Sequence, residues 1–313
     1  MSNQTHENTL AVGIIQTTAN AARAWPNVAT SPAMSSVEDS RAWQEISKAI
    51  RTFHGGGHKP QLIVLPELSL PRTRLDDFDR LVAALNVIAV AGVDYRLDRK
   101  LRIARNEGIV FIPKNFFQAR PSKRCTRVIF GKSYAAPKEE SKLHSLVPPW
   151  SFAGDHKVYV FDCLQYGKFG VSICYDFMDI ERALMYRDRI QHLFVLAYNR
   201  DLGMFRSLAD SLSRTIFCNV IVCNTGYHGG SVAVSPYYEA YRRTIYSHDG
   251  RNLFTMQVVD LPVFELVQAQ RGFAGRTTVT ETRQVFKEPP PGMRGSKSGR
   301  KLSIRNPSVT SAD

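Results

Sequence analysis

The sequence predicts an α/β protein in which helices cover the faces of a β-sheet. Short apolar runs rich in β-branched residues alternate with segments whose apolar residues recur at helical spacing. The 313 residues are 43% hydrophobic and 22% charged, which is ordinary globular usage and allows a large core. Composition does not break between residue 11 and about 265. We therefore expect one domain over 1–286, followed by a basic, flexible tail over 287–313.

The elements of the first half follow in chain order. Compact apolar runs predict strands at 11–16, 62–65, 87–93 and 108–112. Ser35 and Glu38 have the spacing of a capping box, which marks the start of a helix. The apolar face of that helix consists of Trp43, Ile46, Ile50 and Phe53. A second helix is predicted from the similarly spaced Leu75, Phe78, Leu81, Val82 and Leu85.

The second half begins with a polar, basic stretch over 114–156, in which a short apolar run at 128–130 predicts a strand. Further strands are predicted at 158–162, 169–173, 192–196, 220–223, 232–234 and 253–259. Helical spacing predicts a helix over about 180–189 and another that carries Phe205, Leu208, Leu212 and Ile216.

Composition and motifs exclude several classes of protein. The apolar runs are far shorter than the roughly 18 residues of a membrane span, and residues 1–10 lack a signal-peptide pattern, so we expect no membrane association. Five scattered cysteines without a CxxC pair argue against a disulfide framework and favour the cytoplasm. The chain has neither metal-ligand spacing nor a nucleotide fingerprint, so we expect no metal and no cofactor.

The formal net charge of +13 favours anionic partners, nucleic acid among them. A surface charge that merely keeps the protein soluble is an equally good interpretation. Residues 237–246 mix tyrosine with arginine, a combination typical both of single-stranded nucleic-acid binding and of packed subunit interfaces.

Three predicted strands end in residues that can carry chemistry. The strand at 62–65 is followed by Glu67, the strand at 128–130 by Lys132, and the strand at 169–173 by Cys174. Functional groups of layered α/β proteins commonly lie just beyond the carboxyl ends of strands. These three side chains are therefore candidates for one shared pocket.

A carboxylate, an ammonium and a thiol suit acyl transfer. Glu67 would take the proton of the Cys174 thiol, which is mostly protonated at neutral pH, and would later activate water. Lys132 and the backbone N–H of Tyr175 would stabilise the developing oxyanion. Each residue also has an ordinary interpretation: Glu67 as a solvated loop carboxylate, Lys132 as a surface charge and Cys174 as an inert core thiol.

The segments LIVLPELSL, GKSYAAPKEE and KFGVSICYDFMDIERA resemble the nitrilase (carbon–nitrogen hydrolase) superfamily, in that family's order. The resemblance extends from Val12 to about Pro262. It implies a four-layer α-β-β-α sandwich and hydrolysis of a non-peptide amide, carbamoyl or nitrile C–N bond. By resemblance, Cys174 is the nucleophile, Glu67 the base and Lys132 the oxyanion lysine.

The resemblance also implies a second glutamate after the lysine, for which Glu140 is the better match and Glu139 the competitor. Glu181 occupies the place of the family's distal glutamate. The chain departs from the family pattern at 177–181, which reads FMDIE instead of containing a Phe-Pro step, and at Ser133-Tyr134, where a histidine is frequent. These departures affect the prediction of the substrate more than the assignment of Glu67, Lys132 and Cys174.

Two further expectations complete the sequence-based interpretation. Tyr198 and Asn199 follow the strand at 192–196 and are candidate substrate-binding residues, with an ordinary polar loop as the alternative. The resemblance implies a homodimer or larger assembly, with an interface around 180–218. The alternative function is a catalytically weak nitrilase-like scaffold that binds nucleic acid or a protein partner through its basic surface.

Overall fold

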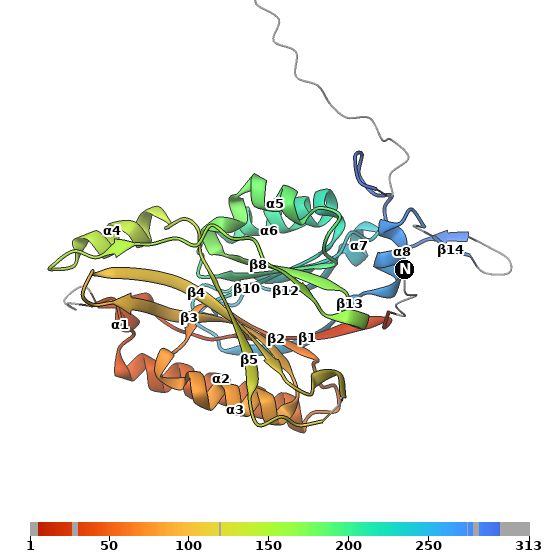
Figure 1. Ribbon diagram of the computed structural model, residues 1–313. Helices are drawn as coiled ribbons and strands as arrows, with labels where there is room; N and C mark the ends of the chain where they lie inside the picture. Colours follow the sequence, from red (N-terminus) through yellow and green to blue (C-terminus); the bar gives the residue numbers. More distant parts are fainter. Residues whose placement is uncertain (1–5, 27–30, 119, 274, 278–281, 295–313) are drawn as a thin grey trace, which may run out of the picture.

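The computed structural model describes residues 6–26, 31–118, 120–273, 275–277 and 282–294, which form two large β-sheets packed face to face (Figure 1). Helices α2 (Ser36–Gly55) and α3 (Leu75–Leu85) cover the outer face of the first sheet. Helices α5 (Ile180–Tyr186) and α6 (Leu202–Leu212) cover the second. The result is the expected four-layer α-β-β-α sandwich.

The first sheet has the strand order β13-β1-β2-β3-β4-β5, with β6 beside β4. Strands β1 and β2 are parallel, as are β2 and β3, while the other main pairs of this sheet are antiparallel. Its strands are β1 (Thr9–Gln16), β2 (Leu62–Leu70), β3 (Ile88–Asp98), β4 (Ile103–Pro113), β5 (Cys125–Gly131), β6 (Ser151–Phe152) and β13 (Thr255–Pro262).

The second sheet has the order β12-β11-β10-β9-β8-β7, with a parallel centre made of β8, β9 and β10. Its strands are β7 (Val160–Asp162), β8 (Lys168–Ile173), β9 (His192–Ala197), β10 (Asn219–Asn224), β11 (Ser231–Val234) and β12 (Thr244–His248). Smaller elements are α1 (Ala21–Ala24), α4 (Pro137–Ser145), α7 (Ala240–Arg243), α8 (Phe264–Gln270), β14 (Gly275–Thr277) and β15 (Thr282–Gln284).

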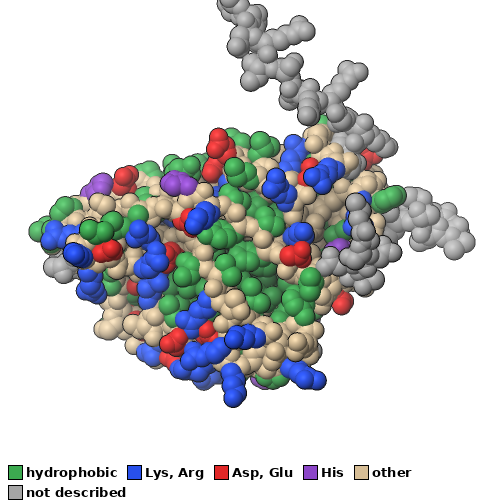
Figure 2. Space-filling view, viewed as in Figure 1, with side chains coloured by type: hydrophobic (Ala, Val, Ile, Leu, Met, Phe, Trp, Pro, Cys, Tyr) green, Lys and Arg blue, Asp and Glu red, His purple; other side chains and the backbone are tan. Residues whose placement is uncertain are grey.

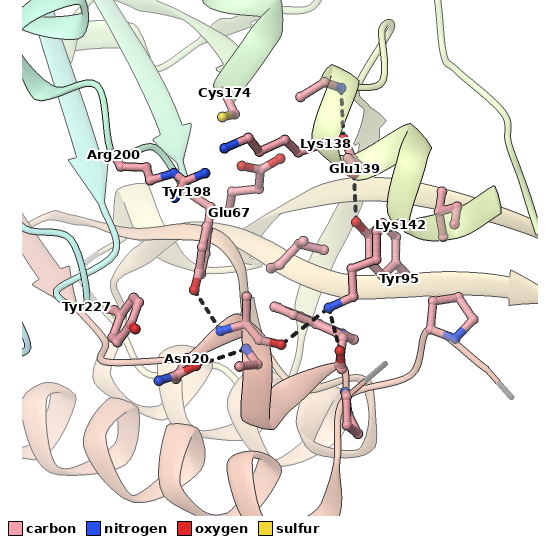
Figure 3. A pocket seen from close by; sticks show the side chains of 18 of the residues that line it. Asn20, Glu67, Tyr95, Lys138, Glu139, Lys142, Cys174, Tyr198, Arg200 and Tyr227 are labelled. Carbon is pink, nitrogen blue, oxygen red and sulfur yellow. Dashed lines mark hydrogen bonds between the residues drawn. The ribbon is translucent and has the colours of Figure 1, made fainter. Parts of the chain in front are cut away.

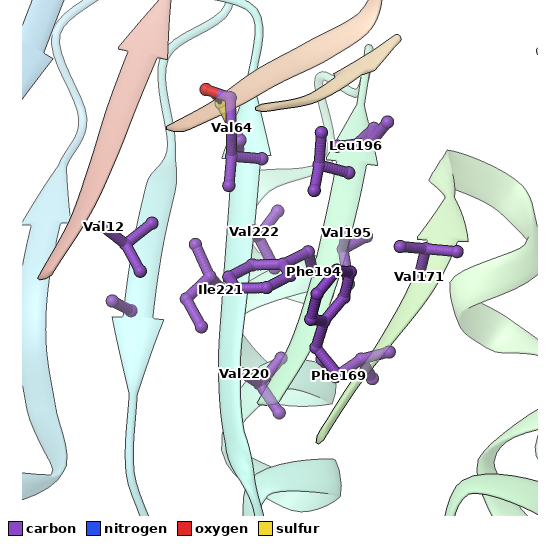
Figure 4. Packing of buried hydrophobic residues seen from close by; sticks show 14 of the residues in the cluster. Val12, Val64, Phe169, Val171, Phe194, Val195, Leu196, Val220, Ile221 and Val222 are labelled. Atoms are coloured by element: carbon purple, nitrogen blue, oxygen red, sulfur yellow. Dashed lines mark hydrogen bonds between the residues drawn. The ribbon is translucent and has the colours of Figure 1, made fainter. Parts of the chain in front are cut away.

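Two apolar cores hold the layers together. One lies between the sheets, where Val12 and Val64 of the first sheet meet Phe194 and Ile221 of the second (Figure 4). The other lies between the first sheet and the helices that cover it. It includes Ile46, Ile50, Phe53, Phe78 and Val82. The apolar spacing that predicted α2 and α3 therefore marks the faces that they bury.

Local signals explain where the main helices begin. The side chain of Ser35 accepts a hydrogen bond from the backbone N–H of Glu38 at 3.4 Å, which confirms the predicted start of α2. The reciprocal half of a capping box is not formed, because the backbone N–H of Ser35 donates to the carbonyl of Ala24. Helix α4 lies in the polar stretch for which the sequence predicts no helix. It buries Leu143 as its one fully buried side chain, so it lacks the apolar stripe that reveals the other helices.

The expected tail begins too early. Met293 is buried, and the backbone N–H of Lys287 donates to the carbonyl of Pro236 at 3.1 Å, so residues 287–294 belong to the folded body. The rest of the expected tail, 295–313, lies outside the described residues. Across the described part of the chain, none of the helices combines the length and apolar character that a membrane crossing requires.

Candidate active site

Glu67 lies at an irregularity in β2, where pairing with β3 shifts between Leu65 and Leu70. Leu68, the next residue, has a φ of +54°, in the left-handed region. Opposite stands Gly92 of β3, where an added Cβ would lie 2.2 Å from the carbonyl oxygen of Pro66. The irregularity thus requires a glycine on the neighbouring strand, and it presents a buried glutamate in the middle of the sheet.

Lys132 follows β5, and its side chain is 1% exposed. Its Nζ lies 2.8 Å from Oε1 of Glu67 and 2.6 Å from Oε2 of Glu139. Burial opposes the charged form of an amine, but the charges of the two glutamates outweigh it and raise the pKa of Lys132 well above its ordinary value. The lysine is therefore a permanent cation in the interior.

Cys174 directly follows β8 and adopts a φ of +46°, an uncommon conformation for a residue other than glycine. Burial, and then the negative charge of Glu67, raises the pKa of the Cys174 thiol well above its ordinary value. The backbone N–H of Tyr198 faces the sulfur and acts in the opposite direction. The resting thiol is thus protonated and lies beside a carboxylate that can accept its proton.

The glutamate that accompanies Lys132 is Glu139, and not Glu140, which the sequence analysis preferred. Glu139 contacts Lys132, whereas Glu140 is exposed on α4. Glu139 is the third residue of the helix, and its side chain accepts a hydrogen bond from the backbone N–H of Ala136 at 3.2 Å. Pro137 at the first helical position and a glutamate two residues later form a helix-start pattern, which would have selected Glu139.

Two residues that the sequence interpretation missed hold the carboxylates in place. The side-chain amide of Asn106 donates to Glu67 and to Glu139, each at 2.8 Å. The hydroxyl of Tyr95 donates to Glu139 at 2.8 Å. Asn106 stands between Arg105 and Glu107 in the polar part of β4, so its local sequence gave no signal that set it apart.

The two glutamates differ in proton affinity. Burial raises the pKa of Glu67, and the charge of Lys132 offsets this only in part. For Glu139 burial acts in the same direction, but Lys132 and the Asn106 and Tyr95 donors outweigh it, so its pKa lies below the ordinary value. Glu67 is therefore the carboxyl group suited to accept and return a proton, whereas Glu139 stays ionised.

The carboxylate of Asp176 joins the loop after Lys132 to the segment after Cys174. Asp176 accepts hydrogen bonds from the backbone N–H groups of Ser133 at 2.7 Å and Tyr134 at 3.0 Å. Buried Arg182 approaches the same carboxylate at 3.3 Å. Glu181, at the position of the family's distal glutamate, is exposed at the start of α5.

A cavity of about 410 Å³ opens in front of the cluster (Figure 3). Glu67, Lys132, Glu139 and Cys174 line it, as does Tyr198, which thus lies where the sequence interpretation placed it. The Tyr198 hydroxyl bridges the backbone of Ala19 and Ala21, so its ring forms a fixed wall.

Two other expected site residues stand apart from the lining. Asn199 is not part of the cavity wall; its backbone is bound by the side chain of Asn224. Tyr175 directly follows Cys174, and its side chain is 38% exposed. Within the described parts of the chain, no group of three or more His, Cys, Asp or Glu side chains is arranged to hold a metal ion.

Solved structures share this architecture. Nit3 from Saccharomyces cerevisiae, a member of branch 10 of the nitrilase superfamily, has a TM-score of 0.57 and 17% identity over 90% of this chain and 98% of its own. A carbon–nitrogen hydrolase from Helicobacter pylori has a TM-score of 0.60 and 12% identity over 84% of this chain and 92% of its own. The chain has the nitrilase fold.

A mutant amidase from Nesterenkonia sp. has the same fold, with a TM-score of 0.55 and 14% identity over 83% of this chain and 92% of its own. In that structure the acetamide moiety of fluoroacetamide is added covalently to the active-site cysteine. No protein-family model matches the present chain, and no curated protein matches its sequence. The likeness to these structures therefore lies in the fold, at a sequence identity of 12–17%.

Proposed function

We propose that this protein is a divergent carbon–nitrogen hydrolase that cleaves a non-peptide amide or nitrile through a covalent Cys174 intermediate. One observation carries the proposal. Glu67, Lys132 and Cys174 come from three strands of two different sheets, yet they all line one cavity. Burying a carboxylate, an ammonium and a thiol together costs stability, and folding alone does not require it.

For an amide, the first step forms the carbon–sulfur bond. Glu67 accepts the thiol proton as the sulfur attacks the carbonyl carbon, and the carbonyl oxygen becomes an oxyanion. The Lys132 ammonium and the backbone N–H of Tyr175 stabilise that oxyanion. Glu67 then returns the proton to the leaving amine as the carbon–nitrogen bond breaks, which leaves a thioester on Cys174.

The second step reverses these roles with water. Glu67 takes a proton from a water molecule that attacks the thioester carbon, the carbon–sulfur bond breaks, and the proton passes to the cysteine sulfur. The products are a carboxylic acid and the free thiol. Glu139 acts through Lys132, because its fixed negative charge holds the ammonium in position at 2.6 Å.

Covalent trapping tests the proposal directly. We expect fluoroacetamide to add one acetamide group to Cys174, detectable by intact-protein and peptide mass spectrometry, and we expect turnover of members of a panel of small amides and nitriles. The Cys174→Ala variant should lose both. Cys163→Ala is the matched control, because Cys163 is also buried but does not line the cavity. Full turnover by Cys174→Ala would refute the mechanism.

We also infer that the protein forms a homodimer through the region 180–218. Ile180, Leu184 and Met185 expose their apolar side chains on α5, and apolar surface of this kind favours association. In light scattering, Leu184→Glu should shift the protein toward the monomer, whereas Leu101→Glu, a matched exposed site in the β3–β4 turn, should not. A monomer at all protein concentrations would contradict the inference.

The binding-module alternative is supported by the basic surface, whose Lys and Arg side chains are spread over the face drawn in Figure 2, and by one exposed aromatic residue. Tyr241 lies exposed in the tyrosine- and arginine-rich segment 237–246. Tyr237 and Tyr238 of this segment, however, already hold Arg242 and Lys287 over their rings at 4.4 and 4.6 Å. Salt-dependent binding to single-stranded RNA or DNA by a protein without amidase activity would favour the alternative.

A further inference from the structure

The wall of the cavity in front of Cys174 carries an excess of positive charge. Its basic side chains are Lys132, Lys138, Lys142 and Arg200, and its acidic side chains are Glu67 and Glu139. Both glutamates are ion-paired with Lys132. Within the described parts of the chain, no carboxylate lies at ion-pair distance from the other three cations.

Lys142 has a structural task. Its Nζ donates hydrogen bonds to the backbone carbonyls of Ala21, at 3.4 Å, and Trp25, and so fixes the segment around α1. Partial burial lowers its pKa. Among the described residues, no comparable side-chain hydrogen bond to the backbone is made by Arg200 or Lys138, and both are exposed at the mouth of the cavity.

The fold holds the backbone of Arg200 in the wall of the cavity that Cys174 also lines. Arg200 lies two residues beyond Tyr198, whose backbone N–H faces Cys174. The side chain of Asn224 clamps the intervening residue: it accepts from the backbone N–H of Asn199 at 2.9 Å and donates to its carbonyl at 2.6 Å. The guanidinium of Arg200 therefore extends from a fixed backbone.

Lys138 reaches the same space from the opposite side. It precedes Glu139 on α4, and adjacent helical residues point about 100° apart, so Lys138 faces the mouth while Glu139 contacts Lys132. Figure 3 shows Lys138 and Arg200 extending from opposite walls toward the space in front of Cys174 and Glu67. His228 also lines this end, and burial together with the charges of Arg200 and Arg251 lowers its pKa, so the imidazole is neutral there.

We propose that the substrate carries, besides the scissile C–N group, a second group that is anionic, a carboxylate or a phosphate, which Arg200 and Lys138 bind at the mouth of the cavity. This inference rests on the proposed function and names the substrate class of the same site. The guanidinium fork of Arg200 matches two oxygens of either anion, and the Lys138 ammonium adds a point charge. The buried glutamates repel an anion from the floor, so the substrate enters with its neutral amide first.

Three amides that differ at one end test the inference: succinamate carries a carboxylate, 3-phosphonopropionamide a phosphonate, and butyramide no charge. We expect kcat/KM for one of the two anionic amides to exceed that for butyramide by about tenfold or more, and the preferred one identifies the anion. In Arg200→Gln and Lys138→Gln, the ratio of kcat/KM for the preferred anionic amide to kcat/KM for butyramide should fall severalfold. Arg51→Gln and Lys48→Gln, which remove the same charges from the solvent face of α2, should keep it. Equal kcat/KM values for all three amides would overturn the inference.

A binding measurement separates this inference from the proposed function. Calorimetry on Cys174→Ala needs no turnover, and we expect its Kd for the preferred anionic amide to lie about tenfold or more below that for butyramide. Anion-dependent binding without hydrolysis by the unmodified protein would refute the proposed function but support the anion site. Hydrolysis of all three amides with equal Kd values would support the function and overturn the anion site.

Discussion

Asp176, two residues after the proposed nucleophile, accepts a 2.7 Å hydrogen bond from the backbone N–H of Ser133, the residue that follows Lys132. The bond joins the end of β8 in one sheet to the end of β5 in the other. The relative position of the sulfur and the ammonium is therefore fixed by a charge-assisted contact across the sandwich, and the packing of the two sheets does not have to define it alone.

Asp176→Asn should damage both stability and activity. The substitution removes the negative charge opposite buried Arg182, which then lacks its ion-pair partner. We expect a loss of about 2–4 kcal/mol in the free energy of unfolding, measured by urea denaturation, and a marked fall in kcat. Asp249→Asn is the control, because Asp249 forms an exposed ion pair with Arg206, and it should cost less than about 1 kcal/mol. Equal losses in the two variants would contradict this account.

Glu139→Gln should weaken the acid dependence of stability. The folded-state pKa of Glu139 is depressed, so its ionised form stabilises the protein above the pKa of the unfolded state, and this contribution is lost as the pH falls through the folded-state pKa. We expect the variant to be less stable than the unmodified protein at pH 7, with the difference shrinking as the pH falls below about 4. Urea denaturation at a series of pH values across this range measures the difference in the free energy of unfolding between the two proteins. A difference that does not change with pH would show that Glu139 acts through packing instead of charge.

The sequence allowed much of this site to be predicted, because Glu67, Lys132 and Cys174 each follow an apolar run that folds as a strand. The predicted strand at 62–65 was too short, since β2 continues past Glu67 to Leu70. Glu140 was preferred to its competitor Glu139 because α4 has almost no apolar face, and only the Pro137–Glu139 helix-start pattern marks which glutamate faces Lys132. Asn106 could not be assigned a role, since its partners Glu67 and Glu139 come from β2 and α4, and only the packing of the folded chain brings the three residues together.

The tail boundary, too, could not be predicted from local composition. Pro-, Gly- and basic-rich composition predicted that residues from 287 onward leave the domain, but Met293 packs into a small core with Phe217 and Leu266. A single buried methionine among polar residues gives no periodic signal, so local composition could not reveal this contact.

Glu67→Gln should separate thiol ionisation from turnover. The negative charge of Glu67 disfavours the Cys174 thiolate and raises the thiol pKa, so removing that charge should lower the pKa. We expect the midpoint of the pH dependence of Cys174 alkylation by iodoacetamide, followed by mass spectrometry, to shift to lower pH. Amide turnover should nevertheless fall by a factor of about 100 or more, because the proton acceptor is lost. A midpoint shifted to higher pH would show that Glu67 stabilises the thiolate.

Gly92→Ala should destabilise the protein through the irregularity that presents Glu67. The new Cβ would lie 2.2 Å from the Pro66 carbonyl oxygen and 2.5 Å from the Cα of Glu67, and both are backbone atoms in a buried strand that cannot move aside cheaply. We expect a loss of about 2–3 kcal/mol in the free energy of unfolding, together with weaker fluoroacetamide trapping as Glu67 shifts. Gly203→Ala is the control: it lies in α6 with Asp201 Oδ1 as its nearest atom at 4.0 Å, so the extra methyl group should stabilise the helix by about 0.5–1 kcal/mol. If Gly92→Ala unfolds at the same urea concentration as the unmodified protein, β3 can yield at this point, and the close approach of the two strands does not determine where Glu67 lies.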